Sequence, residues 1–369
     1  MTKVKDPLFR SLGVEAFAEG DALLVRVPAT GQWLRLHGTA LAIWDGMDYA
    51  RSPSDIAAAL APRFDATPEQ ILPDVTNCLG ELTALGLIEV VADGSRSPMR
   101  DRYLGLLKRA VSNSLYPELE LQIDYLQSGE APVDRLDRQR RLRDIRIERP
   151  GAVAALAAAK RDGMGQGKYA HSISGMVRLT HIERCAERIF AEGIPGDFLE
   201  AGVCRGGAAI LMRGLQIAHG EGDRRIWVVD SFAGVAPSAS GRDRDFALDF
   251  EEPHQPWLAC DLATVRSHFE RYDLLDEGVR FLPGWIAETL PGAPIGPLAL
   301  LRLDLDLYSA TLDVLELLYD RVVPGGYVLV DDYGYLPATR AAVDDFRERR
   351  GIVEPVLNVD RIGSFWRKA

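Results

Sequence analysis

From about Gly196 onward, short apolar runs alternate with stretches of helical spacing. Five runs have the length of a strand, and most of them end in an acidic residue or a glycine: FLEAGV, IWVVDSF, VRFLPG, LALLRLDLD and GYVLVDDYG. The segments between them, such as AAILMRGLQIAH and TLDVLELLYDRV, repeat apolar residues every three or four positions. Buried strands that alternate with helices predict an open, mostly parallel α/β sheet, and PVLNVDRIGSFWRK predicts a final hairpin.

The first ninety residues have a different pattern. ALLVRVP and QWLRLH are short, partly alternating runs on either side of Ala29–Gly31, which predicts a hairpin. Helical spacing follows over residues 38–47, 54–64 and 67–85, and LIEVV then predicts a closing strand. This order of strands and helices is typical of a winged-helix-like domain.

The chain therefore divides into three parts. Residues 1–93 form the small N-terminal domain, and the polar, turn-rich segment ADGSRSP follows as a linker. Residues 94–150 contain an amphipathic helix over 100–116 and a stretch crowded with Arg and Asp over 134–149. That charged stretch is interpreted as a solvated helix or a subunit contact. Residues 151–369 contain the α/β domain.

Composition narrows the class of protein. The 369 residues are 47% hydrophobic and 26% charged, with no run of about 20 apolar residues that would span a membrane. The net charge of −11 argues against nucleic-acid binding, because there is no basic excess to replace phosphate counterions. The four cysteines show no C-x-x-C spacing, so we expect a reducing, cytoplasmic setting.

A glycine-rich turn follows the first strand of the α/β domain, with the spacing E-x-G-x-x-x-G-G over Glu200, Gly202 and Gly206. Glycines allow a sharp turn close to a ligand, and the next helix offers free N–H groups. Asp230 ends the second strand, where a carboxylate can bind a ribose diol. Together they point to a nucleoside-bearing ligand. The alternatives are an ordinary strand-to-helix turn and a capping aspartate.

Gly284 and Trp285 follow the third strand, where an adenine ring can stack; the alternative for Trp285 is a place in the core. Asp304 and the pair Asp331-Asp332 end two further apolar strands.

The carboxyl ends of parallel strands meet at one edge of the sheet, so these three carboxylates are expected to lie close together. Such a cluster requires compensation by a cation or a proton, and oxygen ligands favour Mg²⁺. Asp306 is a competing ligand: if the strand continues that far, alternation places it on the same face as Asp304, and spacing does not separate the two. The alternative is a helix cap beside an exposed turn.

The stretches RYLGLLKRAVSNSLY, GDFLEAGVCRGGAAILMR, VVDSFAGV, VRFLPGWIAETLP, LLRLDLDLYSAT and PGGYVLVDDYG resemble the macrocin O-methyltransferase (TylF-type) family from about Arg100 to the C-terminus. The resemblance implies a Rossmann-like class I methyltransferase that uses S-adenosylmethionine and Mg²⁺ and forms a homodimer or larger homo-oligomer. It also implies natural-product biosynthesis as the setting.

The resemblance further assigns roles to individual residues. Those implied to bind the cofactor are Glu200, Gly202, Gly206, Asp230, Ser231, Gly284, Trp285 and Ser172. Asp304, Asp331 and Asp332 match the metal triad, and Asp304 is also the implied general base for the acceptor hydroxyl.

Three segments depart from the family pattern. The family signature D-G-D-L-Y-E-S-T has a glycine between its two aspartates, whereas this chain reads DLDLYSAT over residues 304–311, with Leu305 in that place. The T-M-I-G element is here SISG, beginning at Ser172, and residues 236–257 differ from the usual acceptor-side lid. Methyl transfer remains the prediction, with the acceptor left open.

The N-terminal unit, about residues 9–91, resembles PqqD-like domains, which capture leader peptides by adding them to an edge strand. The alternative is a docking or dimerisation module. We therefore predict an O-methyltransferase acting on a hydroxyl or carboxyl oxygen of a peptide or a glycosylated metabolite, with no nucleic-acid or membrane partner. The rival hypothesis is a non-catalytic peptide-binding scaffold that retains the methyltransferase fold.

Overall fold

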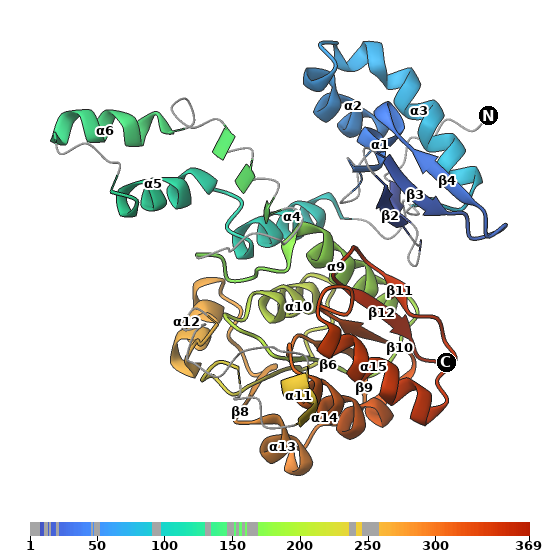
Figure 1. Ribbon diagram of the computed structural model, residues 1–369, viewed down its shortest axis with the longest axis vertical. Coiled ribbons are helices and arrows are strands. Elements are labelled where there is room, and N and C mark those ends of the chain that lie inside the picture. The colour runs from blue at the N-terminus through green and yellow to red at the C-terminus, as the bar shows by residue number, and fades with distance from the viewer. Residues whose placement is uncertain are drawn as a thin grey trace.

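The computed structural model of the protein (Figure 1) describes residues 8–10, 14, 16–19, 22–45, 47, 52–90, 97–129, 134–145, 151–152, 155–156, 159–160, 169–235, 241–245 and 258–369. None of the helices in these parts of the chain has the length and apolar character needed to cross a membrane.

The N-terminal unit has its own core. Its strands are β1 (Leu8–Arg10), β2 (Ala16–Glu19), β3 (Ala22–Arg26), β4 (Trp33–Leu36) and β5 (Ile88–Val90), and its helices are α1 (Gly38–Asp45), α2 (Pro53–Leu60), η1 (Ala61–Arg63) and α3 (Pro68–Ala84). β2, β3 and β4 form an antiparallel sheet, and β1 pairs with β5. Val25, Ile43, Ile56 and Leu79 are among the buried residues that hold the helices and the sheet together.

Local sequence explains where these helices begin. Ser52 caps α2 by accepting from the backbone N–H of Asp55, whose carboxylate accepts in return from the N–H of Ser52. The predicted hairpin at Ala29–Gly31 is confirmed, because β3 and β4 pair antiparallel across it.

The C-terminal part contains a seven-stranded sheet in the order β11-β12-β10-β9-β6-β7-β8. Its strands are β6 (Asp197–Ala201), β7 (Ile226–Asp230), β8 (Val279–Pro283), β9 (Leu298–Leu303), β10 (Val322–Val330), β11 (Leu357–Asn358) and β12 (Ser364–Arg367). β6 to β10 run parallel, whereas β12 is antiparallel to both neighbours. The predicted parallel sheet and final hairpin are confirmed.

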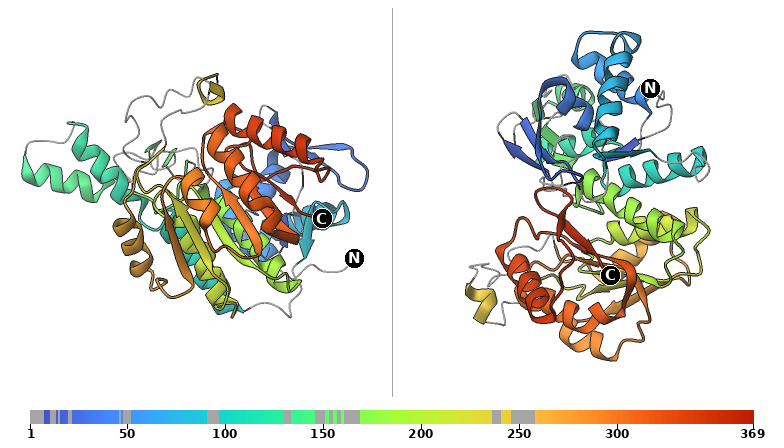
Figure 2. Two further views of the ribbon diagram at one scale, coloured as in Figure 1. Left: turned by 90° about the horizontal axis from the view of Figure 1, so that it is seen from below. Right: turned by 90° about the vertical axis from the view of Figure 1, so that its right-hand side faces the viewer.

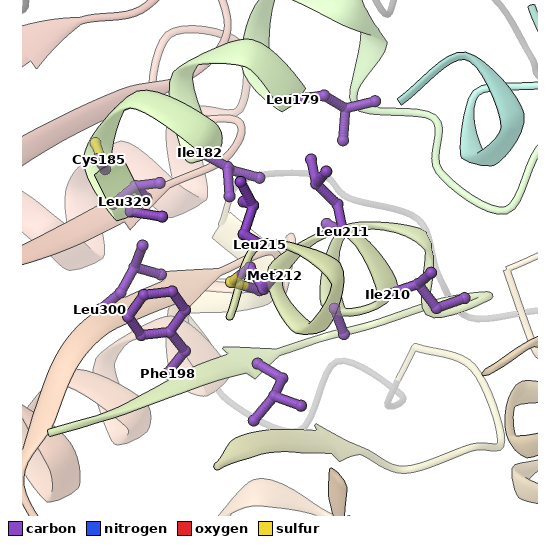
Figure 3. Packing of buried hydrophobic residues seen from close by; sticks show 14 of the residues in the cluster. Leu179, Ile182, Cys185, Phe198, Ile210, Leu211, Met212, Leu215, Leu300 and Leu329 are labelled. Atoms are coloured by element: carbon purple, nitrogen blue, oxygen red, sulfur yellow. The ribbon is translucent and has the colours of Figure 1, made fainter. Parts of the chain in front are cut away.

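Helices cover both faces of this sheet (Figure 2). One face packs on α9 (Gly175–Ala191) and α10 (Gly207–Ala218) through the apolar side chains shown in Figure 3, including Leu179, Phe198 and Met212. α12 (Leu262–Arg271) contributes to the same core. The other face packs on α14 (Tyr308–Leu318) and α15 (Pro337–Arg350), with α13 (Ile286–Thr289), η3 (Leu290–Gly292) and η4 (Tyr319–Arg321) nearby. This sandwich of helices around a sheet is a Rossmann-like fold.

A helical extension connects the two units. α4 (Pro98–Val111) packs on α10, where a side chain at Gly214 would meet Leu107 at 2.3 Å. α5 (Pro117–Gln127) and α6 (Arg135–Arg143) project away from the sheet (Figure 1). The linker residues 91–96 lie outside the described residues.

One strand boundary near the site differs from the expected one. β6 extends to Ala201, so Glu200 lies within the strand, whereas the sequence pattern placed it in the following turn. β9 ends at Leu303, as the sequence pattern predicts, and Asp306 beyond it has a left-handed φ of 62°, so the strand does not continue through Asp304 and Asp306. Of the 236–257 segment, only α11 (Gly241–Asp245) is described.

Candidate active site

Four acidic residues follow β9 and β10, which are neighbours in the sheet with Leu303 opposite Val330. Asp304, Asp306 and Asp332 each offer a carboxylate oxygen, and these oxygens all lie within 4.8 Å of one another. Among the His, Cys, Asp and Glu side chains of the described residues, these three carboxylates form the group whose spacing suits a metal ion. We call it the acidic cluster.

Burial and mutual repulsion raise the pKa values in the acidic cluster. The pKa of Asp304 is raised to about 6 by burial and by the charge of Asp331, and that of Asp306 to about 7 by burial and by Asp304. The pKa of Asp332 lies well above its ordinary value for the same reasons. The ionised carboxylates repel one another, so it is costly for all of them to be charged at once. A divalent cation bound between them would compensate this repulsion.

Asp331 has a different environment. Its carboxylate forms buried ion pairs with Arg178 of α9 and Arg302 of β9. Although burial raises its pKa, these two guanidinium groups bring the pKa below the ordinary value. The structure therefore brings Asp306 together with Asp304 and Asp332, while Asp331 of the predicted triad faces two arginines.

Arg302 links the acidic residues to the glycine turn. Its side chain is 4% exposed and pairs with Glu200 and Asp331, and Nη2 also lies 3.0 Å from an Asp304 oxygen. Sequence reasoning missed Arg302 and Arg178. The signal for Arg302 was available, because it is the lone charged residue in the apolar run LALLRL; a charge there requires buried partners.

Glu200 is almost fully buried, and burial raises its pKa to about 8. Its Oε1 accepts from Arg302, while Oε2 is buried without a hydrogen-bond partner in the described part of the chain. A buried polar atom without a hydrogen-bond partner is costly unless a ligand supplies one. The atom therefore fits a polar group of a bound cofactor.

Gly202 brings the glycine turn against the acidic loop. Its φ is +80°, and a Cβ there would lie 1.8 Å from the carbonyl oxygen of Asp304. The N–H of Asp304 also donates to the Ala201 carbonyl at 2.9 Å. Gly206 has a φ of +82° and begins α10. Only glycine permits this approach of two loops.

Asp230 connects the glycine turn to the end of β7. Its carboxylate accepts from the backbone N–H groups of Val203, at 2.7 Å, and Cys204, at 3.3 Å. The other oxygen accepts from the N–H of Phe232, and the Asp230 carbonyl accepts from the N–H of Gly284. Thus the carboxylate orders both loops around it.

The remaining predicted cofactor residues surround these loops. Ser231 Oγ donates to the Gly234 carbonyl at 2.7 Å. Ser172 lies beside the start of α10, since a Cβ built at Gly207 would lie 2.5 Å from the Cβ of Ser172. Trp285 precedes α13 and is 38% exposed, so its alternative place in the core is wrong.

The strand order and the loops at the carboxyl edge define the class: this is a class I methyltransferase fold with a glycine turn and an acidic cluster side by side. Comparison with known proteins gives the family. Residues 100–368 match macrocin-O-methyltransferase (TylF), and residues 24–88 match coenzyme PQQ synthesis protein D (PqqD). The chain belongs to the macrocin O-methyltransferase (TylF) family and is an S-adenosylmethionine-dependent O-methyltransferase.

The relatives are enzymes that methylate natural products. A tetracenomycin-C-type 4'-O-methyltransferase of Streptomyces olivaceus is 42% identical over 73% of this chain and 93% of its own length. Mycinamicin III 3''-O-methyltransferase of Micromonospora griseorubida is 40% identical over 72% and 96%. The structure of the O-methyltransferase NovP aligns with a TM-score of 0.59 and 37% identity, covering 73% of this chain and 99% of NovP. These relatives support an O-methyltransferase of secondary metabolism.

Proposed function

We propose that the protein transfers a methyl group from S-adenosylmethionine to a hydroxyl oxygen of a glycosylated natural product, with Mg²⁺ at the acidic cluster. The observation that carries the proposal is the backbone contact between Gly202 and Asp304. It joins a loop suited to the methyl donor to a loop of carboxylates suited to the acceptor. The relative of Streptomyces olivaceus has a rhamnosyl compound in its name, which supports a sugar hydroxyl as the acceptor.

The residues proposed to hold the cofactor fit that task. The unpartnered Oε2 of Glu200 forms a hydrogen bond with a polar group of the ligand, and the two glycines leave room for the ligand to approach the backbone. Trp285 presents an exposed aromatic ring suited to stacking on adenine. Asp230, Ser231, Gly284 and Ser172 complete the proposed set.

The proposed cation ligands are Asp304 and Asp332, with a third carboxylate from either Asp331 or Asp306. The family signature implies Asp331 as the third ligand, whereas Asp306 is the residue that lies in the acidic cluster. When bound, Mg²⁺ supplies positive charge that lowers the pKa of the acceptor hydroxyl.

Asp304 is the proposed general base. Its carboxylate lies directly after β9, where the Gly202 contact places it beside the loop proposed to hold the methyl donor. It takes the proton of the acceptor hydroxyl while the oxygen forms a bond to the methyl carbon and the carbon–sulfur bond breaks. The products are the methyl ether and S-adenosylhomocysteine, so atoms and charge balance.

The test is transfer of labelled methyl groups into a panel of deoxysugar glycosides, with Mg²⁺ and with a chelator. Asp304→Asn should reduce transfer by about 100-fold or more if it is the base. Asp331→Asn and Asp306→Asn identify the third ligand by their effect on metal affinity. Transfer that is insensitive to the chelator and to Asp304→Asn would contradict the assigned roles.

A peptide acceptor is the second candidate, because residues 24–88 match PqqD. β4 is an edge of the three-stranded sheet, and Trp33 on it is 47% exposed. A peptide can add to such an edge through main-chain hydrogen bonds. Label recovered in a peptide fraction, and lost when Leu34→Pro disrupts the β4 edge, would favour this acceptor over a sugar.

We also propose that the protein forms a homo-oligomer through the helical extension. Of the 15 exposed large apolar side chains in the described chain, seven lie in α4 to α6 or directly between them: Met99, Tyr103, Leu106, Tyr116, Leu119, Leu126 and Leu136. Such a concentration marks an interaction surface. Sedimentation of the wild type against Leu119→Glu/Leu126→Glu tests it, with a shift to monomer expected.

A further inference from the structure

The helix that follows the acidic cluster lacks a cap of its own. α14 begins at Tyr308, and its N-cap residue, Leu307, has no polar side chain to accept from the first free N–H groups. Uncapped N–H groups weaken the first turn of a helix. That turn directly follows the loop that carries Asp304 and Asp306, so its rigidity bears on the site.

Asp243 of α11 supplies the missing cap from a distant part of the chain. Its fully buried carboxylate accepts from the backbone N–H of Ser309 at 3.2 Å and from the Ser309 hydroxyl at 2.6 Å. This geometry is that of an N-cap, with the acceptor coming from another segment. A carboxylate is also favoured there by the helix dipole.

A second contact holds α11 in the same place. Arg242 pairs with Asp345 of α15, and its guanidinium lies 4.9 Å from the centre of the Tyr308 ring. The Tyr308 hydroxyl donates to the same Asp345 oxygen at 2.9 Å. α11 is thus tied to both α14 and α15, beside the carboxyl edge of the sheet (Figure 1).

The sequence of α14 is suited to this cap. Ser309 is small and donates to Asp243, whereas a glutamate at this position, as in the signature of the family, would set a second carboxylate against it. Like charges at this distance repel.

We propose that Asp243 is a positioning residue for the reaction: by capping α14 from a separate segment, it fixes the loop that places Asp304 and Asp306. The inference deepens the proposed function, and its metal-binding test rests on that function. Asp243 itself is assigned no contact with cofactor or acceptor.

Hydrogen exchange of the full chain tests the cap without a metal. Asp243→Ala, which removes both acceptor oxygens, should speed amide exchange in peptides covering residues 304–312 by roughly 10-fold, the effect of losing a helix cap. Ser309→Glu should do the same, while Ser309→Thr keeps the hydroxyl and slow exchange. Peptides from β7 report global unfolding and should not change.

Asp313→Ala is the matched control. Asp313 lies in α14, where burial and the charge of Asp243 raise its pKa, so the same substitution removes a neighbouring carboxyl and leaves the cap intact. Unchanged exchange in Asp243→Ala, or equal acceleration in Asp313→Ala, would overturn the inference.

Mn²⁺ affinity, followed by paramagnetic resonance, separates this inference from the proposed metal site. We expect Asp243→Ala to weaken Mn²⁺ binding several-fold and to leave S-adenosylhomocysteine affinity within twofold of the wild type. Equal Mn²⁺ affinity in wild type and variant would overturn the positioning role. A wild type that binds no Mn²⁺ would refute the metal site, and the exchange experiment alone would then decide the role of Asp243.

Discussion

At the residue scale, Arg302 is the charge on which the site depends. It faces Glu200, Asp304 and Asp331, so one buried guanidinium compensates three carboxyl groups. Burying a pair of charges stabilises a protein little in itself, but removing one partner leaves the others uncompensated. Arg302 is therefore important mainly because its loss would leave three carboxyl groups without a compensating charge, and less for the energy of any single contact.

Arg302→Met should lower the free energy of unfolding by about 3–5 kcal/mol at neutral pH, because it strands buried carboxylates. Arg349→Met is the control, since Arg349 pairs with Glu316 at the surface and its loss should cost under about 1 kcal/mol. Urea denaturation at pH 7 measures both. Similar losses of unfolding free energy in the two variants would show that the buried network contributes no more to stability than a surface ion pair does.

His181 gives the stability of the protein a dependence on acid. It is 8% exposed, and burial with the charge of Arg184 lowers its pKa to about 3, from an ordinary 6.5. The unfolded chain takes up a proton below pH 6.5 while the folded chain does not, so this contribution to stability is lost as the pH falls below 6.5.

Replacing His181 should remove that dependence. Between pH 7 and pH 5, the stability of His181→Leu should improve relative to the wild type by about 2 kcal/mol, which is 1.5 pH units at about 1.4 kcal/mol each. Denaturant unfolding at the two pH values measures the difference. Parallel pH profiles for the two proteins would refute a neutral buried imidazole.

At the element scale, the sequence predicted the sheet and its edge well. Apolar runs identify the strands, and parallel pairing then brings Asp304, Asp331 and Asp332 to one edge without further information. Spacing did not predict which way each carboxylate faces. Asp331 faces Arg178, a residue on α9 more than 150 positions earlier, and only the packing of that helix reveals the pair.

The capping of α14 illustrates the same limit. Leu307 gives no capping signal, and the acceptor of the Ser309 N–H comes from α11, 66 residues away. Local patterns such as the capping box of α2 are readable from sequence because both partners lie within one turn. A cap supplied from another segment has no local pattern.

At the scale of the whole molecule, the chain has separate hydrophobic cores. One unites the helices and strands of residues 14–88, and two others lie on the two faces of the seven-stranded sheet. Domains with cores of their own unfold as separate cooperative units. The sequence indicated this division through the change of pattern between the first ninety residues and the rest.

Calorimetry should accordingly resolve two transitions. S-adenosylhomocysteine at 100 times its dissociation constant should stabilise the methyltransferase unit by about 2.7 kcal/mol and raise only its transition temperature. The transition of the N-terminal unit should stay in place. A single transition that moves as a whole with ligand would mean that the two units unfold together.

The contact between Gly202 and the Asp304 carbonyl has a consequence for how such enzymes diverge. Because main-chain atoms set the spacing between the glycine turn and the acidic loop, side-chain changes elsewhere have little leverage on it. The relative position of the two loops is then fixed by the backbone itself. A change of acceptor is therefore expected to leave this backbone contact in place and to require substitutions outside the two loops.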